Sequence, residues 1–220
     1  MTVYDIAARL PGIDVLRRRC QALALLDAII DADYYTFGTW GDGEVAAMRD
    51  GSGEEFDIVF RSGGVFIRGV YHESPMLTHT EGRLWPNLLT GLPEQFRAEV
   101  DEPAFNRPGG GLDATFVLWR RTGDDRWHAG EGIDFSPADD DEVNPDGSWL
   151  LNVLLDDITE KYAECAEEVF EVTLPPAAIR HIVEHRPWDD AVVDMLNPKA
   201  DHHRVRATAT EIGYPPATRR

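Results

Sequence analysis

The sequence predicts an α+β fold in which an antiparallel meander sheet is accompanied by helices at the N-terminus and in the C-terminal third. Two observations carry this prediction. Short segments rich in β-branched and aromatic residues fill the first half of the chain between glycine-rich turns, and helical periodicity dominates from Asp146 onward. Strands that precede helices, instead of alternating with them, favour an antiparallel sheet.

One domain is expected over residues 1–220, because 43% of the residues are apolar and 10% are aromatic, which is enough for a continuous core. Within this single α+β domain, residues 1–33 should be helical, residues 34–135 mainly β, and residues 146–214 helical.

A helix near the N-terminus is predicted by apolar residues that recur at intervals of three and four. They are Ile13, Leu16, Cys20, Leu23, Leu26 and Ile30. This spacing places all six on one helix face, which we expect to be buried. The arginines at positions 17 to 19 lie largely off that face.

Four strands are predicted next, because β-rich segments are separated by short glycine turns that are typical of hairpins. The segments are residues 34–40, 44–49, 54–60 and 65–72. In the third, Phe56, Ile58 and Phe60 alternate with Glu55 and Asp57, which predicts one buried sheet face and one partly wet face.

A further strand is expected at residues 115–119 (TFVLW). Successive side chains of a strand point to opposite faces of the sheet, and nearly all five are apolar, so this strand should be covered on both faces. Trp127 and His128 should belong to the strand that follows. Between the strand groups, the segment from Pro93 to Val100 is typical of a short helix that proline begins. The helices after residue 146 should pack against the sheet.

The charge of the chain is concentrated in one segment. The net charge is −19, and residues 131–171 contain fourteen Asp and Glu residues against a single lysine, Lys161. An acidic face steers a cationic protein towards it, and aromatic residues are enriched at binding hot spots. We therefore predict a basic protein partner and a partner surface made by Asp139, Asp140, Asp141, Glu142 and Trp149. The alternative is that these acidic residues bind no partner and only keep the protein soluble.

Several other classes of function have little support in the sequence. Nucleic-acid binding requires clustered Lys and Arg residues that the chain lacks, and no apolar stretch approaches the roughly 18 residues of a membrane span. A secretory signal is not visible, and the two cysteines, Cys20 and Cys165, are not a disulfide framework, so a cytoplasmic protein is expected. No cofactor is expected, because the glycine-rich residues 108–111 lack the Lys-Ser/Thr of a phosphate-binding loop.

Two residues support an alternative, catalytic function. His72 and Glu73 follow a predicted strand end, where side chains project from a rigid frame. A histidine beside a carboxylate suits general-base catalysis, and Ser74 is a nearby hydroxyl, so a hydrolase that uses His72 and Glu73, with or without a metal, is the alternative. Against it, no G-x-S-x-G motif surrounds Ser74, and the pair would serve equally well as a strand cap.

A metal site is considered at His181 and His185, which are four residues apart on a predicted helix and would face one ion together. Zinc needs a third and usually a fourth ligand, and only the non-adjacent His202 and Glu184 are candidates. We therefore expect a pair of histidines on a helix surface and no metal site.

A resemblance to known proteins rests on five segments of the chain. They are GSGEEFDIVF, GVFIRGVYHESPM, WPNLLTGLPEQF, FVLWRRTGDDRWHAGEG and PDGSWLLNVLLDD. Together they resemble a widespread family of uncharacterised bacterial proteins over roughly residues 35 to 157. The acidity and layout of the chain are also generally similar to those of immunity proteins from bacterial toxin systems. The sequence and this resemblance together predict a noncatalytic acidic protein-binding module, with neutralisation of a basic toxin as its role.

Overall fold

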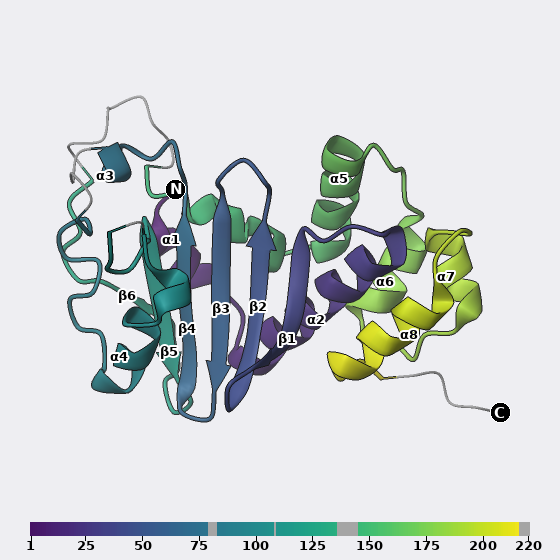
Figure 1. Ribbon diagram of the computed structural model, residues 1–220, viewed down its shortest axis with the longest axis horizontal. Helices are drawn as coiled ribbons and strands as arrows, with labels where there is room; N and C mark the ends of the chain where they lie inside the picture. The colour runs from purple at the N-terminus through teal and green to yellow at the C-terminus, as the bar shows by residue number, and fades with distance from the viewer. Residues whose placement is uncertain (79–82, 108, 136–144, 216–220) are drawn as a thin grey trace.

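The predicted meander sheet is confirmed by the computed structural model, which describes residues 1–78, 83–107, 109–135 and 145–215. Six strands form one antiparallel sheet in the order β1-β2-β3-β4-β5-β6, so every strand pairs with its neighbours in sequence (Figure 1). The strands are β1 (Tyr35–Trp40), β2 (Gly43–Arg49), β3 (Glu55–Arg61), β4 (Gly64–Val70), β5 (Phe116–Arg121) and β6 (His128–Ala129).

The turn between β3 and β4 depends on a glycine. Gly64 has a φ of +153°, and a Cβ there would lie 2.3 Å from the carbonyl oxygen of Arg120 on the adjacent strand β5. Only a residue without a side chain lets β4 and β5 approach this closely. The glycine-rich turns noted in the sequence therefore allow close strand pairing as well as chain reversal.

One face of the sheet carries the main core. Helix α1 (Val3–Arg9) and helix α2 (Ile13–Ile30) contribute to this core, and α2 contacts β1. In α2, however, every residue from Cys20 to Ile29 is buried, which goes beyond the single apolar face that the spacing predicts. The reason is that the opposite side of α2 is covered by helices from the C-terminal third of the chain.

Only some of the later helices pack against the sheet as expected: Leu154 lies beside Ala46 and Phe56 of the sheet, whereas the last three helices pack on α2. The later helices are η3 (Ser148–Leu154), α5 (Ile158–Phe170), α6 (Pro176–Val183), α7 (Asp190–Leu196) and α8 (His202–Glu211). Helices α6, α7 and α8 pack on α2 and extend beyond the β1 edge of the sheet (Figure 1). Helix α5 reaches β1 through Tyr162, whose ring centroid lies 6.4 Å from that of Tyr35.

On the second face of the sheet, Glu55 of β3 is half-buried and Thr36 of β1 is exposed, in keeping with the predicted partly wet face, whereas Asp57 is buried against that prediction. From β3 to β5 this face is covered. A smaller apolar cluster covers it, formed by Val59, Phe66, Phe96, Val100, Phe105, Leu112, Ala114, Val117 and Trp119. Some of these residues come from the short helical segments η1 (Glu94–Phe96), α4 (Arg97–Val100) and η2 (Pro103–Phe105). On β5 the burial prediction is confirmed: Phe116 and Leu118 enter the main core, and Val117 and Trp119 enter the smaller cluster.

In the parts of the chain that the structure describes, no helix has the length and apolar character needed to span a membrane. Cys20 and Cys165 are both free thiols.

Candidate functional site

The candidate site lies where β4 ends and where the turn between β2 and β3 passes beside it. His72 stands two residues beyond the end of β4, and its Nδ1 atom is 2.5 Å from Oε1 of Glu54. Glu54 is buried, whereas the His72 side chain is 45% exposed. A buried carboxylate at Nδ1 holds the imidazole in one orientation and leaves Nε2 accessible.

Glu73, the partner expected from the sequence, is more distant. Its Oε1 atom lies 4.0 Å from Nε2 of His72, and its other carboxylate oxygen accepts a hydrogen bond from the Tyr71 hydroxyl at 3.3 Å. Sequence inspection missed Glu54 because it is 18 positions from His72. The hairpin register pairs Glu55 with Val70, and continuing that register by one step brings Glu54 towards the residues after β4.

The turn before β3 supports Glu54. Oδ1 of Asp50 accepts hydrogen bonds from the backbone N–H groups of Ser52, Gly53 and Glu54 at 2.8 to 3.0 Å. The Ser52 hydroxyl contacts both Asp50 and Glu54, and its oxygen is 2.5 Å from Oε2 of Glu54. Burial raises the pKa of Asp50, but the hydrogen bonds with Glu54, Ser52 and Gly53 lower it more, so Asp50 stays ionised.

Ser74, the hydroxyl considered as a nucleophile, has a structural role. It is fully buried, donates a hydrogen bond to the carbonyl oxygen of Pro145 at 2.6 Å, and accepts one from the N–H of Met76 at 3.1 Å. A hydroxyl committed to both contacts and shielded from solvent cannot reach a substrate. Ser74 instead anchors the segment that precedes η3.

Trp149 is exposed, as expected for a contact residue. It is 37% exposed, and its ring meets the Tyr71 ring edge to face at 6.1 Å with an interplanar angle of 80°. This approach requires Gly147, which has a φ of +73°: a Cβ there would lie 2.1 Å from Cβ of Tyr71. Tyr71 and Trp149 therefore form one aromatic surface beside His72 and Glu73. Four other expected contact residues, Asp139, Asp140, Asp141 and Glu142, lie outside the described residues.

Asp146 holds the segment before Trp149 in place. It is fully buried, and its carboxylate accepts hydrogen bonds from the N–H of Val3 at 2.6 Å and of Ser148 at 2.9 Å. Its carbonyl oxygen accepts the hydroxyl of Thr115 at 2.7 Å. Burial raises the pKa of Asp146, and these N–H donors oppose the rise. Asp146 thus fixes the start of the segment that leads to Trp149 between α1 and the residue before β5.

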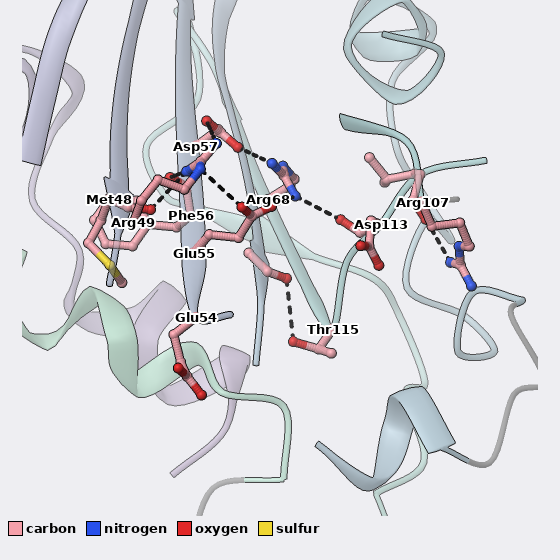
Figure 2. Close-up of polar contacts among 12 residues, drawn as sticks. Met48, Arg49, Glu54, Glu55, Phe56, Asp57, Arg68, Arg107, Asp113 and Thr115 are labelled. Atoms are coloured by element: carbon pink, nitrogen blue, oxygen red, sulfur yellow. Dashed lines mark hydrogen bonds and ion pairs between the residues drawn. The ribbon is translucent and has the colours of Figure 1, made fainter. Parts of the chain in front are cut away.

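A buried ion-pair network lies between the strands next to this site (Figure 2). Arg68 on β4 is only 2% exposed and pairs with Asp57, with Oε1 of Glu55 at 2.5 Å and with the carbonyl oxygen of Asp113 at 3.2 Å. Arg49 adds a second cation, with Nη2 at 2.7 Å from Oδ1 of Asp57. Asp57, which the alternation placed towards water, is therefore buried because Arg68 compensates its charge.

The two histidines considered for metal binding do not share one helix face. Helix α6 ends at Val183, and His185 has a left-handed φ of +54°. Nε2 of His181 lies 2.9 Å from the carbonyl oxygen of Pro187, and Nε2 of His185 lies 2.8 Å from that of Arg18. The predicted helical pair is thus wrong, because the chain leaves the helix between the two residues. Within the described residues, no group of three or more His, Cys, Asp or Glu side chains could hold a metal ion.

Comparisons with protein-family models, with curated proteins and with solved structures find no match to this chain. The resemblance to uncharacterised bacterial proteins and to immunity proteins therefore stays a prediction from the sequence.

Proposed function

We propose that this protein is a noncatalytic module that binds a basic protein partner, and that neutralising a toxin as an immunity protein is its role. The observation that carries the proposal is the exposed Trp149 ring, which packs on Tyr71 next to the carboxylate of Glu73. An exposed tryptophan supported by a second ring presents a rigid apolar contact at little cost in conformational entropy.

The chemistry of this surface suits a cationic side chain. A guanidinium or ammonium group over the face of Trp149 would gain a cation–π interaction, and Glu73 lies near enough to the Tyr71 ring to supply a counter-charge. An arginine of the partner fits best, since its planar group stacks on the ring and also donates to a carboxylate.

The acidic residues have two separate roles in this proposal. Helix α5, which carries Glu160, Glu164, Glu167 and Glu168, lies beyond β1, away from β4 and the residues that follow it (Figure 1). The contact surface is therefore assigned to Trp149 and the segment before it, not to the whole of residues 131–171. The charge of α5 contributes to the long-range field that attracts a basic protein.

The test begins with a basic partner captured from the source cells by the tagged full-length protein and then purified. We expect Trp149→Ala to weaken its binding by about 2 kcal/mol, roughly thirtyfold, because a central aromatic anchor is lost. Surface plasmon resonance at low and at physiological salt would measure the affinity and the association rate.

Two further variants complete this experiment. Met195→Ala removes a side chain that is also exposed but lies on α7, and it should leave the affinity unchanged. Neutralising Asp139, Asp140, Asp141 and Glu142 together should slow association and flatten its salt dependence. The proposal is wrong if the partner binds Trp149→Ala as tightly as it binds the wild type, or if the partner is acidic.

The hydrolase alternative is favoured by one specific observation, the orientation of His72 by Glu54. An imidazole with a buried carboxylate at Nδ1 and an accessible Nε2 can take a proton from a water molecule that attacks a carbonyl group. In this alternative Glu54 is a positioning residue that holds Nδ1 of His72. Glu73 lies near Nε2, the atom that would take the proton.

The alternative is tested with a panel of chromogenic esters. If it holds, His72→Ala should lower kcat by a factor on the order of 100 or more, and Glu54→Gln should also lower kcat while leaving KM nearly unchanged. The exposed His203→Ala is the matched control. Wild-type activity that equals that of His72→Ala would eliminate the hydrolase function and leave the binding proposal untouched.

A further inference from the structure

A pocket of about 620 Å³ lies between α2, the turn that leads into α5, and the end of α6. This volume falls within the range of about 300 to 1,000 Å³ that is typical of small-molecule sites. The pocket shares no lining residue with the Trp149 surface. It is therefore independent of the proposed partner site.

Three arginines line this pocket in a chain whose net charge is −19. Arg19 donates hydrogen bonds to the carbonyl oxygens of Leu154 and Leu155, which fix its guanidinium without neutralising its charge. Arg18 and Arg180 make no side-chain hydrogen bond or ion pair with any residue that the structure describes. A bound anion would supply the partner that Arg18 and Arg180 lack, since guanidinium groups form their strongest hydrogen bonds with anionic acceptors.

The carboxylates that line the same pocket are already engaged. Asp156 pairs with Arg9, and Glu184 pairs with Arg186. Asp157 caps helix α5 by accepting the N–H groups of Thr159 and Glu160. Asp156 and Glu184 thus each pair with an arginine outside the pocket, although the charge of Asp156 also acts on Arg19. Arg18 and Arg180 are left without a carboxylate partner among the described residues.

The walls of the pocket are held by contacts between distant parts of the chain. His185 at the end of α6 contacts the carbonyl oxygen of Arg18 at 2.8 Å, and its ring packs on Tyr214 with 4.5 Å between centroids. Burial lowers the pKa of His185, so the imidazole is neutral at pH 7 and the arginines alone supply the positive charge. A fixed frame of this kind lowers the cost of ordering a ligand.

We infer that this pocket binds a small organic phosphate, held by Arg18, Arg19 and Arg180. A phosphate monoester carries up to two negative charges and accepts bidentate hydrogen bonds from guanidinium groups, so it matches three arginines better than a single carboxylate does. The pocket is larger than a bare phosphate needs, and Val15, Ile158 and Val183 in its lining provide apolar contacts for the organic part.

Isothermal titration of the full-length protein with three probes tests this inference. Phenyl phosphate should bind at one saturable site, inorganic phosphate should bind more weakly because it lacks the ring, and benzoate should bind weakest because it has one charge. Arg18→Gln combined with Arg180→Gln should weaken phenyl phosphate binding about tenfold or more. In NMR spectra of the wild type, the amide resonances of Thr159 and Val183 should shift when phenyl phosphate binds. These shifts locate the site without the use of a variant.

Matched variants separate a site from a general effect of charge. Arg97→Gln combined with Arg126→Gln removes two exposed arginines outside the pocket and should bind phenyl phosphate as the wild type does. Trp149→Ala should also bind normally, since the two surfaces are separate. The inference is overturned if phenyl phosphate does not bind at millimolar concentrations, if benzoate binds as tightly, or if the control variant loses as much affinity as the pocket variant.

Discussion

Replacing Arg68 with methionine should lower the free energy of unfolding by about 3–5 kcal/mol, because the change leaves a carboxylate uncompensated inside the protein. Asp57 is 3% exposed and pairs with Arg68 from the neighbouring strand. Arg49 also contacts Asp57, but it is far more exposed and compensates the charge only in part. Urea unfolding followed by tryptophan fluorescence would measure the difference.

A double variant separates the cost of the unpaired charge from the loss of side-chain packing. Changing Asp57 to leucine in the Arg68→Met background removes both charges, and we expect it to recover most of the lost stability. Arg97→Met, at an exposed position on α4, should cost little. A loss below about 1 kcal/mol in Arg68→Met would show that water or neighbouring cations compensate Asp57 without Arg68.

Stability should also fall with rising pH through the titration of Asp27. This carboxyl lies in α2 and accepts hydrogen bonds from the N–H of Tyr35 at 2.6 Å and the hydroxyl of Tyr162 at 2.7 Å. Burial raises its pKa from 3.8 to about 6, and these hydrogen bonds only partly oppose the rise. The folded protein therefore binds this proton more tightly than the unfolded chain does.

The sign and size of the effect follow from that difference. The contribution is fully present below about pH 4 and is lost as pH rises through 6, and about two pKa units correspond to roughly 3 kcal/mol. Other carboxyl groups titrate in the same range, so the measurement compares the wild type with Asp27→Asn. The stability of the wild type relative to that variant should decrease by this amount between pH 4 and pH 7.

A second variant checks the cause of the pKa shift. The Tyr162 hydroxyl stabilises the ionised form of Asp27, so Tyr162→Phe should raise the pKa of Asp27 further and move the loss of stability to higher pH. A stability difference between the wild type and Asp27→Asn that stays constant from pH 4 to pH 7 would contradict the prediction. Chemical denaturation at each pH would give these values.

Much of the local architecture followed from patterns within single segments. The hairpins from Tyr35 to Val70 were predicted because their turns contain the glycines that tight reversals need, and β5 because TFVLW is apolar at nearly every position. The helix that the structure places at Ile13–Ile30 was predicted from the spacing of its apolar residues. Each of these properties depends on neighbours within a few residues.

The candidate site depended on pairs that sequence inspection does not bring together. His72 was singled out because it follows a strand, but its partner Glu54 comes from the other side of a hairpin. Knowledge of the β3–β4 register would have found the pair. At the other end of the molecule, the pocket arginines come from α2 and α6, whose packing no local pattern reports.

The sequence by itself determined the α+β class and the strand order of the meander. The tertiary structure alone decided which polar groups are buried. Alternation places Asp57 towards water, and only Arg68 on the next strand allows it to be covered. The physical reason is that burying a charge is costly unless an opposite charge meets it, and that partner is supplied by the fold, not by the neighbouring residues.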